Sequence, residues 1–360
     1  MKKLLLILFI VLTLLSLCAC KDNADTPQEI ADVPNIDHNI LDADRHLGNS
    51  FENYSSEDTL LVEYGNRIYH AYNSRHEIME YCTANDKETP LGIYGTNLSV
   101  YKNVLYYIGE DGTSIHAYDL ATNTDSVWIT GEEIAMLLPE PTYQYPRISD
   151  LIVTDYGMCM LYGDSQYLTH ISFEKALIST SYESGMIFTH PGNNLTDLIV
   201  ISSNKLCALY KNSFCIYDSS SVAYSYLPID PYLFATSVGS DGHNSYFYSL
   251  LYPNLLKLDA DSLSLTASIF FEEYDTHILP KSKYGDYIYF SVLKPDNSCY
   301  QFMRKSISDN SCFVLMDDCA VTHLTFTSNN MVYGITANVG EEFVSYFKTD
   351  IDFQNVTYLD

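Results

Sequence analysis

Basic residues are scarce in this chain of 360 residues, which has 19 Lys and Arg against 46 Asp and Glu and a formal net charge of −27. An electrostatic field of this sign repels nucleic acid and anionic lipid head groups. We therefore expect no nucleic-acid partner. The same charge favours solubility and cationic partners, although it names none of them.

Motifs that carry catalysis or bind metals are also missing. The sequence has no G-x-S-x-G elbow, phosphate-binding glycine loop, EF-hand loop or C-x-x-C pair. Residues 76–80 (HEIME) begin like the zinc motif H-E-x-x-H, but the fifth position is Glu80 and the segment is expected at a hairpin tip. The acidic residues of segments 259–261 (DAD) and 350–352 (DID) are expected to be solvated turn carboxylates, because the other ligands of a calcium loop are absent. Because the sequence contains no catalytic motif, we expect no catalytic residues and no bound metal or cofactor.

The one long apolar run lies at the N-terminus, over residues 4–17, after two lysines. It is shorter than the roughly 20 residues that span a membrane, and its pattern is typical of a secretory signal. Residues 17–20 (LCAC) resemble the lipobox of bacterial lipoproteins, in which a small residue precedes a cysteine that is acylated and becomes the new N-terminus. The resemblance implies a signal peptide over residues 1–19 and lipidation of Cys20. An ordinary cleaved signal with an incidental cysteine is the alternative.

The segment after this cysteine is acidic and poor in aromatic residues. Residues 21–58 hold ten acidic side chains and two basic ones, a composition that cannot bury enough apolar surface to fold alone. We expect residues 20–58 to be a lipidated cysteine followed by a flexible tether that faces outside the cytoplasm, with ends roughly 35 Å apart. Loss of residues 1–19 would remove two lysines and change the net charge from −27 to −29.

The remaining cysteines do not form a disulfide framework. They are odd in number and scattered through a large domain, at Cys82, Cys159, Cys207, Cys215, Cys299, Cys312 and Cys319. Cys207 and Cys215 could face each other across a hairpin. Two buried, unpaired thiols are the interpretation that we favour.

From residue 59 onward, tyrosine and β-branched residues form short apolar runs separated by turn residues, a pattern typical of strands and hairpins. The first apolar residue of each expected hairpin recurs at Ile68, Leu105, Met158, Leu206, Tyr246, Ile288 and Val332. The mean spacing is 44 residues, and four-stranded propeller blades recur at about 40–45 residues. The sequence therefore predicts an all-β domain over residues 59–360, a β-propeller with seven blades, six or eight being the alternatives.

One hairpin carries a family resemblance. Residues 115–123 (IHAYDLATN) resemble blades of quinoprotein-type and low-density-lipoprotein-receptor-type propellers, and the chain is similar to bacterial lipoproteins that carry such a propeller. The resemblance covers residues 59–360 at the level of the repeat pattern. The chain lacks the Tyr-Trp-Thr-Asp signature of receptor-type blades, and Trp128 is its one tryptophan, whereas quinoprotein blades contain recurring tryptophans. No quinone cofactor is therefore expected.

Two long connections between the expected blades hold the candidate binding residues, because binding residues are concentrated on such loops. The candidates are Glu132, Glu133, Tyr143 and Tyr145 in the first connection, and Glu273, Tyr274 and His277 in the second. Tyrosines beside carboxylates suit a peptide or another cationic partner, whereas merely tolerated insertions are the alternative. The sequence favours a binding or scaffold module that contacts a protein, peptide or envelope component. The alternative is a carbohydrate-active hydrolase or lyase with carboxylates at the central mouth of the propeller, where the channel along its axis opens.

Overall fold

The computed structural model describes residues 59–138, 147–163, 167–181, 196–202, 205–210, 213–228, 235–241, 243–249, 254–271, 278–294, 299–327, 330–337 and 344–359. Strands dominate these ranges. They form one sheet of seven strands and five sheets of four strands, in which neighbouring strands are antiparallel. The predicted all-β class is confirmed.

The seven-stranded sheet contains two blades. It consists of β1 (Leu61–Tyr64), β2 (Arg67–His70), β3 (Glu77–Cys82), β4 (Lys87–Tyr101), β5 (Val104–Gly109), β6 (Ser114–Asp119) and β7 (Thr124–Thr130). The first half of β4 pairs with β3, up to Tyr94, and the second half pairs with β5, from Gly95 onward. A Cβ at Gly95 would lie 2.3 Å from the carbonyl oxygen of Ile108, so glycine is required where the strand changes partner. The two halves of β4 therefore belong to blades 1 and 2.

Each of the other five sheets is one blade. Blade 3 consists of β8 (Ile148–Thr154), β9 (Gly157–Tyr162), β10 (Tyr167–Ile171) and β11 (Leu177–Thr180). Blade 4 consists of β12 (Thr196–Ser202), β13 (Lys205–Tyr210), β14 (Ser213–Asp218) and β15 (Ala223–Pro228). Blade 5 consists of β16 (Ala235–Ser240), β17 (Asn244–Ser249), β18 (Asn254–Asp259) and β19 (Leu265–Ile269). Blade 6 consists of β20 (Ile278–Tyr284), β21 (Tyr287–Leu293), β22 (Tyr300–Ser306) and β23 (Cys312–Met316), and blade 7 of β24 (Ala320–Phe326), β25 (Met331–Ala337), β26 (Val344–Asp350) and β27 (Thr357–Leu359).

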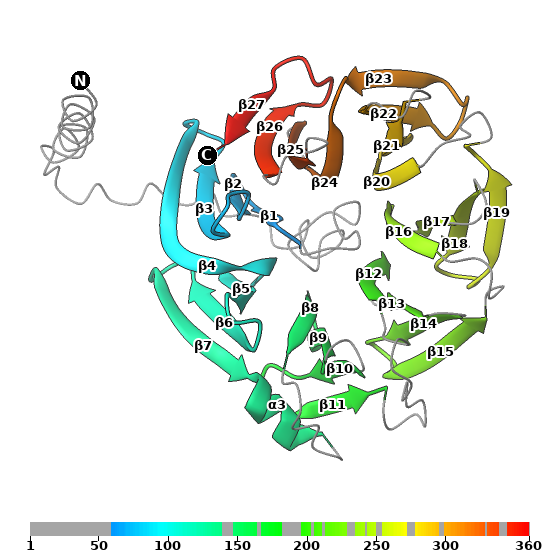
Figure 1. Cartoon of the computed structure of the whole chain (residues 1–360). Helices are drawn as coiled ribbons and strands as arrows, with labels where there is room; N and C mark the ends of the chain where they lie inside the picture. The colour runs from blue at the N-terminus through cyan, green and yellow to red at the C-terminus, as the bar shows by residue number, and fades with distance from the viewer. Residues whose placement is uncertain are drawn as a thin grey trace, which may run out of the picture. The chain divides into compact units, whose positions relative to one another are not determined.

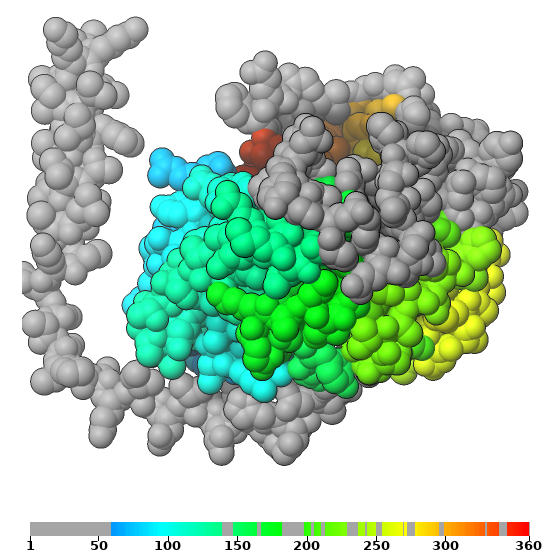
Figure 2. Space-filling view, turned by 90° about the horizontal axis from the view of Figure 1, so that it is seen from below, coloured from blue at the N-terminus to red at the C-terminus, as the bar shows by residue number. Residues whose placement is uncertain are grey.

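The blades follow one another around a ring in chain order, with the first strand of each blade innermost (Figure 1). Along the outer side, the blades succeed one another from the cyan of β4 to the yellow of β19 (Figure 2). The described residues thus form a β-propeller. The residues that marked the expected hairpins all fall in the second strand of a blade, from Ile68 in β2 to Val332 in β25, so the repeat predicted from the sequence is confirmed.

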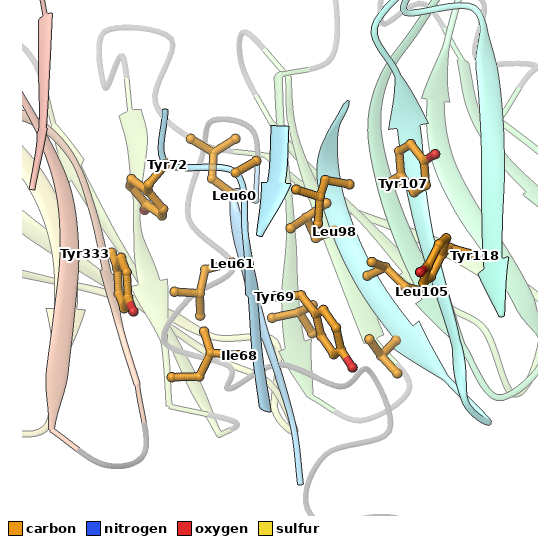
Figure 3. Packing of buried hydrophobic residues seen from close by; sticks show 14 of the residues in the cluster. Leu60, Leu61, Ile68, Tyr69, Tyr72, Leu98, Leu105, Tyr107, Tyr118 and Tyr333 are labelled. Carbon is orange, nitrogen blue, oxygen red and sulfur yellow. The ribbon is translucent and has the colours of Figure 1, made fainter. Parts of the chain in front are cut away.

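Alternate strand residues pack on the two neighbouring blades. Leu61 and Ile68 point toward Tyr333 of blade 7, whereas Tyr69 points to the other side, toward Leu105 of blade 2 (Figure 3). This follows from the two-residue period of a strand. The apolar clusters lie between consecutive blades in the same way, which explains why so many strand positions are tyrosine, phenylalanine or a β-branched residue.

Blade 1 and blade 7 meet through side chains. In the described part of the chain, the strands of blade 1 come from residues 61–94 and those of blade 7 from residues 320–359, so the two blades share no strand. A hydrogen bond of 2.6 Å joins the hydroxyls of Tyr72 and Thr325, and the ring of Tyr333 lies 4.9 Å from the ring of His70 and 5.7 Å from that of Tyr72. We call this contact between blades 1 and 7 the seam.

The antiparallel order gives the ring two different ends. The tight turns between first and second strands, and between third and fourth strands, lie at one end, which we call the turn face; it includes residues 65–66, 102–103, 155–156 and 172–176. The loops between second and third strands and the connections between blades lie at the other end. We call this end the loop face; it includes residues 71–76, 110–113 and 131–138. The described loops between second and third strands are therefore gathered at the end opposite to the tight turns.

The connection after β7 begins with a short helix, α3 (Gly131–Leu137), which the sequence interpretation did not anticipate. The sequence feature that starts this helix is a capping box. The hydroxyl of Thr130 accepts a hydrogen bond from the amide of Glu133, and the carboxylate of Glu133 accepts one from the amide of Thr130. Within the described residues, no helix has the length and apolar character needed to cross a membrane.

Candidate functional site

The larger of two cavities described below lies in the seam and has a volume of about 420 Å³. Its size falls within the range of roughly 300–1,000 Å³ that small-ligand pockets have. It is lined by His70, Tyr72, Asn73, Ser74, Arg75, Glu77, Met79 and Glu88 of blade 1 and by Tyr358 and Leu359 of blade 7. We call it the seam cavity. Four of these residues, 72–75, belong to the loop face.

A buried histidine and a carboxylate form one wall of the seam cavity. His70 is only 2% exposed, and its Nε2 lies 2.7 Å from Oε1 of Glu88. The hydrogen bond from His70, with a smaller contribution from Lys348, lowers the pKa of Glu88, while partial burial opposes this shift. Since a carboxylate only accepts, Nε2 donates. Nδ1 of the same ring is buried and has no hydrogen-bond partner among the described residues.

The loop between β2 and β3 is ordered by Asn73. Its side-chain oxygen accepts from the amides of Arg75, at 3.2 Å, and Glu77, at 3.0 Å, and its amide group donates to the carbonyl of Glu77, at 2.7 Å. His76 has a positive φ of 51°, which turns the chain back into β3. The loop thereby holds the exposed guanidinium of Arg75 and the half-buried carboxylate of Glu77 beside the seam cavity.

A second cavity of about 250 Å³ lies next to blade 2. It is lined by His76, Gly95, Thr96, Asn97, Ile108, Gly109, Glu110, Gly112, Arg147, Ile148 and Ser149. Backbone hydrogen bonds fix its walls, from Gly95 to the carbonyl of His76 and from Ile148 to the carbonyl of Gly112. Loop-face residues therefore line both cavities: those of blade 1 line the seam cavity, and those of blades 1 and 2 line the second cavity.

Glu132 and Glu133, which the sequence predicts as binding residues, have different surroundings in the structure. Glu133 completes the capping box of α3, and the hydrogen bond from the backbone of Thr130 is the largest cause that lowers the pKa of its carboxyl. Glu132 is exposed in the first turn of the same helix. Both lie on the loop face. The side chain of Glu132 is exposed, whereas Glu133 has a structural role in the capping box.

The other predicted site residues lie outside the described residues. These are Tyr143, Tyr145, Glu273, Tyr274, His277 and the lipidation site Cys20. Their roles remain predictions. The residues of the seam cavity were missed, because no motif connects residues 70–88 with residues 358–359; only the closed ring brings them together.

The segments that partly resemble metal-binding motifs form a strand and turns in the structure. His76 lies in the loop before β3, and residues 77–80 belong to that strand. Asp259 and Asp350 accept hydrogen bonds from amides of their own turns, which lowers the pKa of each carboxyl. Across the part of the chain that the structure describes, no group of three or more His, Cys, Asp or Glu side chains could hold a metal ion.

Cys207 and Cys215 are both buried, and neither is in a disulfide bond. Cys207 lies opposite Ile216 and Cys215 opposite Ala208, so the two side chains point to opposite faces of blade 4. Cys215 packs toward blade 3 and Cys207 toward blade 5. The favoured interpretation, two buried cysteines that no disulfide joins, is confirmed.

Comparison with known proteins identifies the fold. A protein from Lactobacillus plantarum has a TM-score of 0.51 at 13% identity over 85% of this chain and 94% of its own. Oligogalacturonate lyase in complex with manganese gives 0.51 at 10% identity, over 85% and 90% of the two chains. The β-propeller domain of the Trilobed protease from Pyrococcus furiosus, which has an open velcro topology, gives 0.50 at 10% identity, over 84% and 95%. The sequence matches no family model and no curated protein. The similarity establishes the β-propeller class.

Proposed function

We propose that the protein is an exported, membrane-anchored binding module that contacts a protein, peptide or envelope component through the loop face of its propeller. The observation that carries this proposal is the position of the two cavities, both of which include loop-face residues. Ligands bind at concave sites that carry a few polar groups. A propeller that binds its partner through one end is therefore expected to have cavities at that end.

Two further features support the proposal. Residues 17–20 resemble a lipobox, and acylation of Cys20 would hold the propeller at a membrane surface, where a partner in the envelope lies within reach of a tether. The net charge, −27 for the full chain and −29 after loss of the two lysines in residues 1–19, would speed association with a cationic partner. Glu132 adds an exposed carboxylate on the loop face itself.

The test compares matched tyrosine variants on the two ends of the ring. Affinity capture from intact membranes uses the full chain as bait, the double variant Tyr143→Ala/Tyr145→Ala as the loop-side change, and Tyr156→Ala as its control. Tyr156 is 47% exposed in a turn of the turn face. We expect the double variant to lose the captured partner and Tyr156→Ala to keep it, with melting temperatures unchanged in both.

Two outcomes would overturn the proposal. Capture that depends on Tyr156 and not on the loop variants would place the working surface at the turn face. Turnover of a polysaccharide by the purified chain, abolished by a carboxylate substitution at the central mouth, would replace the binding module with a hydrolase or lyase.

A further inference from the structure

We propose that the ring opens reversibly at the seam: in the folded protein, blades 1 and 7 separate from each other while the other neighbouring blades stay packed. Consecutive blades follow one another directly along the chain, so every interface except the seam is also held by a covalent connection. The contacts that close the seam are between side chains. Such an opening goes beyond the proposed function and does not depend on it.

Blade 7 packs unequally on its two neighbours. Toward blade 6 it contributes six buried apolar side chains, which are Val321, Leu324, Phe326, Val332, Phe347 and Phe353. Toward blade 1 it contributes two buried side chains, Tyr333 and Tyr346, and both are amphipathic. Because hydrophobic stabilisation grows with the apolar area removed from water, blade 7 is held more strongly by blade 6 than by blade 1.

The innermost strand of blade 7, β24, presents polar side chains to blade 1. Its Leu324 and Phe326 belong to the apolar cluster with blade 6, as described above. His323 and Thr325 alternate with them and meet Tyr72 of blade 1. The hydroxyls of Tyr72 and Thr325 are 2.6 Å apart, and the ring centroids of Tyr72 and His323 are 5.7 Å apart. When the blades separate, water replaces these partners, so the loss of such a hydrogen bond costs little net free energy.

Two buried polar atoms at the seam have no hydrogen-bond partner among the described residues, Nδ1 of His70 and the hydroxyl of Tyr333. The two rings lie against each other across the seam, with centroids 4.9 Å apart. Separation of the blades uncovers both rings, and water can then bond atoms that the closed seam leaves unsatisfied. The seam cavity of about 420 Å³ also reduces the van der Waals contact between the two blades. Each of these features lowers the free energy needed to separate blades 1 and 7.

Opening gives the loop face a way to respond to a partner. Residues 72–75 of blade 1 and residues 358–359 of blade 7 line the seam cavity from its two sides. A ligand that contacts both sides binds the closed ring and loses part of its contacts in the open one. Such a ligand would shift the ring toward the closed state by its difference in affinity.

Alkylation of a thiol buried in the seam of the folded full chain tests the opening. Ile68 is 1% exposed and points toward Tyr333 of blade 7 (Figure 3), so Ile68→Cys places the probe; Leu61→Cys, on the same side of blade 1, serves if that variant does not fold. Cys159 and Cys207 are references inside the same molecule, since both are 0% exposed and pack between blades 3 and 4 and between blades 4 and 5. Mass spectrometry gives the rate at each site, normalised to the urea-unfolded chain. We expect the seam thiol to react at least about tenfold faster than either reference. Low concentrations of urea should leave its rate nearly unchanged, because separation of two blades exposes far less surface than global unfolding.

Matched tyrosine variants show whether the seam itself controls this rate. Tyr72→Phe removes the hydroxyl that bonds to Thr325 across the seam, and the rate at the seam thiol should rise by roughly twofold to tenfold as the open ring becomes more populated. Tyr217→Phe removes a buried hydroxyl that lies 2.7 Å from Nδ1 of His170, between blades 3 and 4, and should leave the seam rate within about twofold. Melting temperatures report whether each variant is folded.

Two reagents separate an open ring from local access to one side chain. Iodoacetamide is small and N-(1-pyrenyl)maleimide is large, and an open ring admits both. Reaction with iodoacetamide alone would overturn the opening, and so would equal normalised rates at the seam thiol and at the two references. An equal rise in rate in Tyr217→Phe would likewise overturn it, because the labelling would then report the stability of the whole ring.

Discussion

At the scale of single residues, two histidines whose pKa values are lowered in the folded protein make the propeller sensitive to acid. His170 is 1% exposed, with Nδ1 2.7 Å from the hydroxyl of Tyr217, and burial lowers its pKa to about 4. Burial also lowers the pKa of His323 to about 4, with Lys281 contributing in the same direction. Both rings are neutral in the folded protein at neutral pH, and a proton binds more readily to the unfolded chain.

We therefore expect stability to fall with pH between about 6.5 and 4. Above pH 6.5, roughly the pKa of a histidine in the unfolded chain, protonation of the two rings does not reduce the free energy of unfolding. As the pH falls from there toward the folded-state pKa, the unfolded chain binds protons that the folded protein does not. The free energy of unfolding then decreases by an amount on the order of a few kcal/mol for the two rings together. Melting temperatures measured at constant ionic strength from pH 7.5 to 4.5 report the slope.

The variant His170→Leu should make this slope smaller, since one of the two rings is gone, while carboxyl groups with lowered pKa values, such as Glu88, keep their own contribution. Tyr217 keeps a partner in this variant, because the hydroxyl of Ser179 donates to it at 2.9 Å. A slope equal to that of the parent would show that His170 is not the neutral, buried group described here.

At the scale of elements, the sequence predicted the strands well and the helix not at all. Each second strand was found because its apolar run is local and its spacing repeats, as at Leu105 and Met158. The signal for α3 was also local, a Thr130-x-x-Glu133 box, but two glutamates in a long connection were interpreted as binding residues. A short amphipathic segment between strands has too few residues to show a helical period.

The capping box makes a prediction about α3. Thr130→Ala should destabilise the helix by about 1 kcal/mol, because the amide of Glu133 loses its acceptor. Hydrogen exchange at the amides of residues 133–137 should accelerate by about fivefold. Glu132→Gln leaves the box intact and should change exchange little. Equal acceleration in both variants would mean that charge at the helix start, and not the cap, stabilises α3.

Packing between blades makes a second prediction for the elements. Phe247 is fully buried between blades 4 and 5, with its ring centroid 4.5 Å from that of Phe214. Phe247→Ala should cost about 3–5 kcal/mol of unfolding free energy, because a large cavity remains between two sheets. Phe313→Ala removes the same group from a position that is 46% exposed and should cost well under half as much. Urea denaturation measures both, and similar costs would contradict the packing described here.

At the scale of the whole molecule, the seam is the feature that sequence alone could not reveal. Blade 1 and blade 7 are separated by about the whole length of the described chain, and no local pattern near His70 or Glu88 refers to Tyr358. The repeat predicted that a ring closes, but not which side chains meet where it does. The described start of the first candidate connection, residues 131–138, shares the loop face with residues 72–75 of the seam cavity, because the strand order places both at the same end of the ring.

Removal of the last blade tests the ring as a unit. A chain that ends before Val321 would expose Leu61 and Ile68, which pack toward Tyr333, and would also expose the blade 7 side of Tyr289 and Phe302. We expect an insoluble product, since each blade is stabilised by its two neighbours. A soluble truncation with a cooperative unfolding transition would contradict this interdependence.

The central claim is that side chains of blade 1 and blade 7 close the ring, and a double-mutant cycle tests it most directly. The cycle combines Tyr72→Phe with Thr325→Val, two buried residues that are 253 positions apart and joined by a 2.6 Å hydrogen bond. Each substitution removes one hydroxyl and keeps the shape of the side chain. Urea denaturation of the four proteins should give a coupling energy of about 0.5–1.5 kcal/mol. A coupling of zero, with both single variants folded, would mean that these blades do not meet as described.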